Sequence, residues 1–304
     1  MNTYEQLTSE IKGETIIAYQ NASLLGLFQG VDIGDIGVEN WFHKNISDIP
    51  DAALTLAGFN PSQAKLNATL FSHAVLTAAE SLTISEKEMA QFSKFGLDAE
   101  GVAMLGQKVG ELATMYLFRG IDMEGTATSG DANSIFHAGS GTLAAPSIIT
   151  SATNGAWGTY SNKVDDVYQI IGDLIAAGHN VATSVIFYPK SCHAAMNGHS
   201  TNELSAVQML QEQGVFSILP MDDAYLWTLA GAVPVNILFD LYAVDLAKIK
   251  IGYTRTEGTN VIGPHDVVRD TVAECEVWFT PYMVPLPKDS GITKGVSRIS
   301  AIAP

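Results

Sequence analysis

The sequence predicts an α+β fold, and three observations lead to that prediction. A long amphipathic helix is expected between Asp98 and Gly120, and a second helix runs from residues 161–162 to a stop at Gly178. Most strand-like segments follow these helices instead of alternating with them, which is the order of an α+β protein and not of a regular βαβ repeat. The 304 residues are 47% hydrophobic, so a sizeable core is available.

The N-terminal third is expected to contain a helix and a projecting hairpin. Residues 1–30 predict a short helix with an irregular tail, whereas segments 37–46 and 69–84 have the composition of strands. The stretch between the two strands is rich in turn residues and has little that could form a core. We expect its tip to pack on another subunit, and the candidate tip residues are Pro50, Phe59 and Pro61.

The long helix is capped by Asp98 and has a regular apolar face. Apolar residues recur along it at three- and four-residue spacing, and the candidate core positions are Leu105, Val109 and Leu112. The next segment, 121–160, is rich in Gly, Ser, Ala and Thr but neither charged nor repetitive, so we expect an ordered, irregular surface loop there.

The second half alternates between short helices and strands before it ends in strands. The buried face of the helix after residues 161–162 is expected to be Val167, Ile170, Ile171, Leu174 and Ile175. Ser200 and Glu203 have the spacing of a capping box for a further helix that ends at Glu212. A short helix is expected at 190–196, and strands are expected at 183–189, 214–220, 236–246, 248–253, 266–284 and 296–302.

Charge and composition exclude several classes of protein. The net charge of −16 opposes binding to nucleic acid, and no basic patch with interleaved aromatic residues is present for reading a base sequence. No stretch approaches the roughly 18 apolar residues that span a bilayer, and the N-terminus predicts no signal peptide. Charged residues make up only 16% of the chain, which favours burial of its surface against copies of itself.

No catalytic, cofactor-binding or metal site is predicted. His193 and His199 lie near Cys192, but no second pair of ligands completes a zinc pattern. Asp222 and Asp223 are adjacent on an extended chain and so face opposite ways, which makes them a poor acid–base pair. Asp165 and Asp166 are explained by a place in the first turn of a helix, where the helix dipole favours acids. The two cysteines are expected to be reduced, buried thiols.

Two long segments, 82–130 and 160–196, resemble the major capsid proteins of tailed double-stranded DNA viruses with the Hong Kong 97-type fold, and also the related encapsulins. In that family a long spine helix ends near an aromatic–Arg–Gly segment, as in "LFRG" at 117–120. An irregular loop, a helix stopped by Gly, a strand, a proline and a short helix follow in the same order. The resemblance covers roughly residues 70–304.

The resemblance implies a division of the chain into five parts. Residues 1–37 would be an N-terminal arm, and residues 38–83 an extended hairpin loop. Residues 84–160 would form the peripheral domain, with the spine helix and a surface loop, and 161–250 the axial domain. The remaining residues, 251–304, would supply the return strands of the peripheral domain and a final axial strand.

The resemblance also implies a function. The chain would assemble with itself, as pentamers and hexamers, into an icosahedral shell that encloses double-stranded DNA without sequence specificity. Portal, scaffolding or decoration proteins would be further partners, no membrane would be involved, and the virion capsid would assemble in the host cytoplasm. The loop at about 220–234 would line the ring axis, with acids at its tip and aromatic shoulders: Asp222, Asp223, Tyr225 and Trp227.

Two alternatives remain open at this point. The first is an encapsulin-type compartment, which has the same fold but encloses a cargo enzyme. The second is of another class, a soluble enzyme with an unrecognised site around His193, His199 and Asp222. An enzyme would form a small oligomer, so particle size separates it from both kinds of shell.

Overall fold

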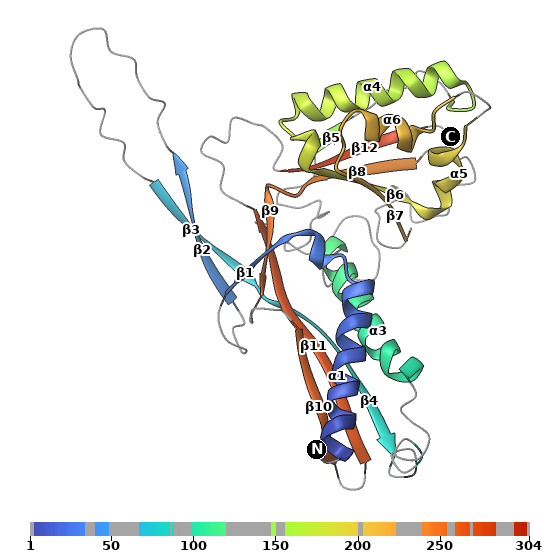
Figure 1. Cartoon of the computed structure of the whole chain (residues 1–304). Helices are drawn as coiled ribbons and strands as arrows, with labels where there is room; N and C mark the ends of the chain where they lie inside the picture. The colour runs from blue at the N-terminus through green and yellow to red at the C-terminus, as the bar shows by residue number, and fades with distance from the viewer. Residues whose placement is uncertain are drawn as a thin grey trace.

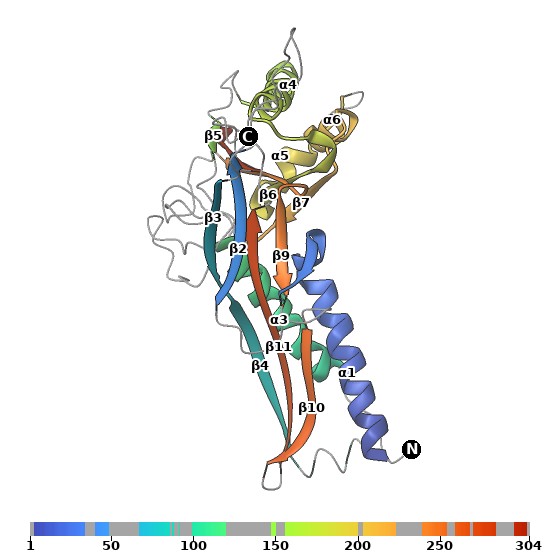
Figure 2. The same ribbon diagram turned by 90° about the vertical axis from the view of Figure 1, so that its left-hand side faces the viewer.

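A computed structural model of the chain describes residues 3–33, 40–48, 67–85, 87, 91, 99–119, 147–149, 156–199, 203–222, 239–253, 259–267, 270–283 and 295–302. The molecule is elongated (Figure 1, Figure 2). A lower body of two helices and a sheet carries the N-terminus, and an upper unit of a second sheet and three helices carries the C-terminus. The predicted α+β class is confirmed.

The lower sheet is built around one long strand, β11 (Asp270–Met283). It pairs antiparallel with β10 (Thr259–Val267), β4 (Leu76–Ser85) and β9 (Ile249–Tyr253), and β1 (Gln29–Asp32) joins β9 in parallel. The strand expected at 266–284 is largely β11, but it begins four residues later than expected, because residues 266 and 267 belong to β10, its antiparallel partner. That segment of sequence contains neither Gly nor Asn to mark a turn, so its strand-forming residues concealed the break.

The expected projecting hairpin is partly reproduced. β2 (Asn40–Asp48) and β3 (Asn67–Ala74) form an antiparallel, two-stranded sheet that extends away from the lower body (Figure 1). The return strand is shorter than expected, because β4 leaves the hairpin and pairs with β11 over ten residues. The tip residues Pro50, Phe59 and Pro61 lie outside the described residues.

Two helices, α1 (Thr3–Ala22) and α3 (Ala99–Arg119), lie side by side in the lower body. They touch through two glycines of α3: a Cβ on Gly106 would lie 2.1 Å from the carbonyl oxygen of Thr15, and one on Gly110 would lie 2.9 Å from that of Tyr19. Glycine therefore allows the two backbones to approach more closely than any other residue would permit. Thr114, one turn further on, donates to the Gly110 oxygen at 2.8 Å and accepts from the Leu24 amide at 3.0 Å.

The neighbouring face of α3 supplies the core of the lower body. Leu105 and Val109 are buried and Leu112 is partly buried, so the large apolar residues expected on this face do contact the core. The cluster continues to the end of the helix, where Phe118 meets Phe187 of the upper sheet edge-on, with ring centroids 5.1 Å apart. One continuous cluster thus spans both parts of the molecule.

The upper sheet has the strand order β5-β12-β8-β6-β7. Its strands are β5 (Ser147–Ile149), β12 (Val296–Ile302), β8 (Phe239–Asp245), β6 (Ser184–Pro189) and β7 (Ser217–Met221). Side chains alternate between its two faces: Val185 and Phe187 belong to the cluster shared with α3, whereas Ile186 and Tyr188 face the helices of the upper unit. Both faces of the sheet are therefore covered, and its two outer strands are the edges.

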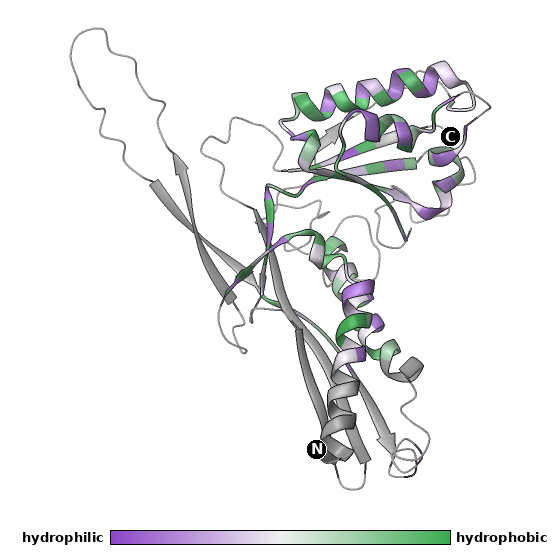
Figure 3. Cartoon of the chain, in the orientation of Figure 1, coloured by the Kyte–Doolittle hydropathy of each residue, from purple (hydrophilic) through white to green (hydrophobic). Residues whose placement is uncertain are grey.

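Three α-helices cover the outer face of this sheet: α4 (Tyr160–Ala176), α5 (His193–Asn197) and α6 (Ala206–Glu212). Helix α4 carries hydrophobic and hydrophilic residues along its whole length (Figure 3). The predicted buried face is correct except at Ile175, which is 60% exposed. Gly178, with φ of 79°, ends the helical segment as expected.

Two further details of the upper unit differ from the sequence prediction. The capping box of α6 is formed by Ser205 and Gln208 rather than by Ser200 and Glu203, because the helix begins only at Ala206. Asp166 is not in the first turn of α4, which begins at Tyr160. It is buried, and its carboxylate accepts a 2.8 Å hydrogen bond from the indole nitrogen of Trp157.

We predict that Gly106→Ala destabilises the protein by about 1–3 kcal/mol, because the added methyl group must push the backbone of α1 away. The matched control is Gly172→Ala in α4, where a Cβ meets nothing within 4 Å. That change should stabilise the helix by up to about 1 kcal/mol. Urea unfolding of the two variants measures both effects, and equal stabilities would show that α1 and α3 do not touch at Gly106.

We also predict that Asp166→Ala lowers stability by about 1–3 kcal/mol, because it leaves the buried indole N–H of Trp157 without this acceptor. Asp165→Ala removes the neighbouring, exposed carboxylate and should change stability by less than about 0.5 kcal/mol. Unfolding curves followed by tryptophan fluorescence test the pair. Similar losses from both substitutions would argue against the buried hydrogen bond.

Candidate functional site

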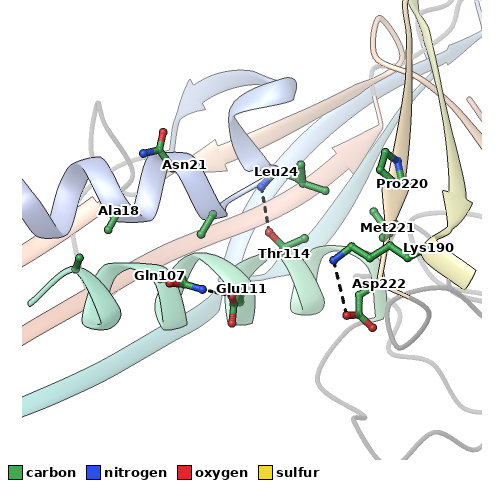
Figure 4. Close-up of a pocket in the computed structure, with 12 residues that line it drawn as sticks. Ala18, Asn21, Leu24, Gln107, Glu111, Thr114, Lys190, Pro220, Met221 and Asp222 are labelled. Atoms are coloured by element: carbon green, nitrogen blue, oxygen red, sulfur yellow. Dashed lines mark hydrogen bonds and ion pairs between the residues drawn. The ribbon is translucent and has the colours of Figure 1, made fainter. Parts of the chain in front are cut away.

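A groove of about 600 Å³ lies where the two helices of the lower body meet the upper unit (Figure 4). Its walls come from α1, α3, the end of β7 and the 3₁₀ turn after β6, η3 (Lys190–Cys192). Small and apolar side chains make up half of the lining: Ala18, Ala22, Leu24, Ala103, Pro220 and Met221.

Four of the polar side chains that line the groove lie in two pairs. Gln107 donates from its side-chain nitrogen to Glu111 at 2.7 Å, one turn further along α3. Lys190 Nζ and Asp222 Oδ2 lie 4.0 Å apart, and their side chains are 64% and 55% exposed, so water screens this ion pair. The lining holds no cysteine, histidine or serine, and its one hydroxyl, that of Thr114, already contacts the Gly110 oxygen and the Leu24 amide.

The residues of the enzyme alternative have separate partners. His193 Nδ1 lies 2.9 Å from the hydroxyl of Tyr188, and His199 Nδ1 lies 3.1 Å from the backbone oxygen of Asn197. Asp222 faces Lys190 across the end of the groove (Figure 4). Among the residues that the structure describes, no three His, Cys, Asp or Glu side chains are grouped so that they could hold a metal ion.

One buried lysine also has a structural role. Lys163 of α4 is buried, and its Nζ donates to the backbone oxygen of Gly198 at 2.8 Å, next to the end of α5. Burial lowers the pKa of Lys163, and the nearby Glu203 carboxylate opposes that shift. The ammonium thus links α4 to the residue that follows α5.

The expected ring-axis loop is described only at its beginning. Asp222 directly follows β7 and is exposed, as a solvated acid should be. Asp223, Tyr225 and Trp227 lie outside the described residues. Their assignment to a ring axis therefore stays a prediction.

Large apolar side chains are exposed at several places on the surface. Ile17 and Met104 are 54% and 56% exposed, and helical spacing places them on the same faces as the groove-lining Asn21 and Gln107. Tyr168 and Ile175 are two turns apart on the outer face of α4, and Phe216 is exposed just before β7. Exposed apolar side chains that line up on element faces are typical of surfaces that bind protein.

The described helices include none whose length and hydropathy would let it cross a bilayer.

Comparison with solved structures identifies the fold. The chain superposes on a virus-like particle protein from Pyrococcus furiosus with a TM-score of 0.56 and 9% identity, over 98% of this chain and 100% of that one. The capsid of Myoviridae phage XM1 superposes with a TM-score of 0.54 and 13% identity, over 92% of this chain and 91% of that one. A structure from Microbacterium phage Oxtober96 superposes with a TM-score of 0.57 and 13% identity, over 91% of this chain and 90% of that one. No family model and no curated protein matches the sequence.

These similarities cover nearly the whole length of both chains, so they concern the complete fold and not one shared motif. The protein has the Hong Kong 97-type capsid fold, as its sequence predicts. At sequence identities of 9–13%, these proteins share the arrangement of helices and strands, but few of their side chains are the same.

Proposed function

We propose that this chain is a structural major capsid protein, which assembles with copies of itself into an icosahedral shell around double-stranded DNA. The observation that carries the proposal is the end-to-end match of its fold to the subunits of capsids and of a virus-like particle. Fold alone does not determine function, because one fold hosts many activities. Two properties of this chain add independent support.

The first property is the surface. Only 16% of the residues are charged, and apolar side chains are exposed on α1, α3 and α4. A protein that stayed monomeric would expose these groups to water, whereas contacts with neighbouring subunits would bury them. The second property is that His193 lies against Tyr188, His199 against the Asn197 backbone and Asp222 against Lys190, so their contacts lend no support to the enzyme alternative.

Assembly would proceed by head-to-tail contacts. When such a contact has the right rotation, five or six copies close into a ring, and rings then join into a shell. The β2–β3 hairpin is suited to reach a neighbour, because it pairs with no other strand of the described chain and a lone two-stranded hairpin is marginally stable in water. The acidic loop after β7 would lie near the ring axis, where water and cations relieve the repulsion between its carboxylates.

DNA would be enclosed without base-specific contacts, since the net charge of −16 gives no attraction to phosphates and keeps the inner wall from holding the packaged molecule. Portal, scaffolding or decoration proteins would complete the virion, and assembly would take place in the host cytoplasm. These finer assignments rest on the capsid proposal.

The first test is the size and content of the particle. We expect the purified protein to sediment as rings or shells far above its monomer mass of 32.4 kDa, with closed particles in electron micrographs. A stable monomer or small oligomer at every salt and protein concentration would overturn the proposal. Particles isolated from the native source should contain DNA, and particles filled instead with one enzyme would identify the encapsulin-type alternative.

The second test concerns the hairpin. Asp48 and Asn67 pair at the outer end of the two strands, so residues 49–66 can be replaced by Asn-Gly, the preferred two-residue turn between antiparallel strands. We expect this variant to keep the unfolding midpoint of the unaltered subunit but to form at least tenfold fewer shells, counted by sedimentation at equal concentration. Normal shell yield would remove the hairpin from the subunit interface.

A further inference from the structure

A short turn connects the two sheets of the molecule. β8 of the upper sheet ends at Asp245, and β9 of the lower sheet begins at Ile249. Within the described chain this is the most direct covalent link between the sheets, and in Figure 1 the strand leaves the upper unit at this point. Any change in the angle between the sheets must therefore be accommodated at residues 245–248.

Backbone hydrogen bonds fix this turn to the upper unit. The Asp245 amide donates to the oxygen of Gly295 at 2.8 Å, just before β12. The Leu246 amide donates to the oxygen of Thr183 at 3.0 Å, at the end of the 3₁₀ turn η2 (Val181–Thr183). The turn is thus held from two sides by segments that are distant in the sequence.

The buried carboxylate of Asp245 is the centre of the arrangement. Its Oδ1 accepts from the hydroxyl of Thr183 at 2.6 Å and from the Ala247 amide at 3.1 Å. Its Oδ2 accepts from the Asn180 amide at 3.1 Å and lies 4.0 Å from the Nζ of Lys248. Because the side chain has no exposure to water, these contacts replace its hydration.

Lys248 closes the cluster on the side of α4. Its Nζ donates to the oxygen of Gly178, directly after that helix. Its stem packs so closely on Gly295 that a Cβ there would lie 2.7 Å from the Cβ of Lys248, and the φ of +90° at Gly295 also favours glycine. The positive charge of Lys248 and the negative charge of Asp245 balance within the buried cluster.

His179 is the member of the cluster whose protonation would change the net charge of the cluster. It is buried, and its Nε2 lies 2.8 Å from the hydroxyl of Ser297 on β12. Its Nδ1 is buried and has no hydrogen-bond partner among the described residues. The charged groups that act on the ring are Asp245 from β8 and Lys248 from the turn. A second proton on the ring would therefore create a buried N–H without an acceptor and one uncompensated positive charge.

We propose that this cluster is an acid-operated latch, which holds the turn 245–248 to the upper unit while His179 is neutral and releases it when Nδ1 takes up a proton. The latch is defined as His179, Asp245, Lys248 and Ser297 with the backbone of 178–183 and 295. The proposal rests on the fold and not on the proposed capsid function. According to this proposal, protonation of one ring nitrogen, His179 Nδ1, controls whether the turn between the two sheets is held or released.

The direction of the pH dependence follows from the burial of the ring. Burial lowers the pKa of His179 to about 4, Asp245 opposes that shift and Lys248 adds to it. With the latch open, His179 would be exposed and its pKa would be near 6.5, so between these values the open state binds the proton more tightly. Opening is therefore independent of pH above about 6.5 and becomes more favourable as the pH falls toward 4.

The test is hydrogen exchange of the full-length protein between pH 7 and pH 4, corrected for the intrinsic rate at each pH. The reporting amides are those of Asp245 and Leu246, which hold the turn to the upper unit, and the reference amides belong to the β6 strand. We expect the opening equilibrium of the reporting amides to rise about 100-fold from pH 6.5 to 4. The reference amides should change much less, because the rest of the sheet stays paired.

Two substitutions assign the effect to one ring. His179→Gln keeps a side-chain nitrogen that can donate to Ser297 but stays neutral at every pH, so it should remove the rise. His199→Gln is the control, since His199 is exposed and lies outside the latch. An undiminished rise in the His179→Gln protein would overturn the proposal.

The unaltered protein gives an independent outcome if the His179→Gln protein does not fold. Reporting amides that stay protected down to pH 4 would show that the latch does not open. Reporting and reference amides that lose protection together would show that acid unfolds the upper unit as a whole, and this result would also overturn the proposal. Release of the reporting amides alone supports it.

Discussion

The architecture depends on the apolar contact at the end of α3, where Phe118 meets Phe187. Both rings belong to one cluster that runs from Tyr19 of α1 to Tyr242 of β8, so the two sheets share the burial of α3. Because close-packed interiors resist compression, this helix can transmit a displacement of the lower body to the upper sheet.

The elements that the sequence predicts well are those with a strong period and clear ends. Helix α3 and helix α4 have apolar residues at helical spacing and a glycine just beyond, so their bounds fall within one or two residues of the prediction. The errors arose where side-chain type and position carry little local information. The two close-contact glycines of α3 interrupt no apolar stripe, and only the place of α1 reveals why Gly106 and Gly110 are needed. The capping box at Ser205 was missed because Ser200 has an equally suitable spacing.

The candidate groove could not be predicted from the sequence, because its lining comes from α1, α3, η3 and the end of β7, which only tertiary packing brings together. The same holds for His179, whose neighbours Asp245 and Ser297 are 66 and 118 residues away in the chain.

The position of Pro220 in β7 has a consequence for the newly made subunit. β7 is an edge strand, and an open edge invites pairing with any other extended chain, which leads to fibrous aggregates. Proline has no N–H to offer, and it occupies the outermost strand opposite Tyr188 of β6, so a foreign strand docking there would lack one ladder bond. This edge is thereby protected against uncontrolled polymerisation, while its side chains remain free to form more selective contacts.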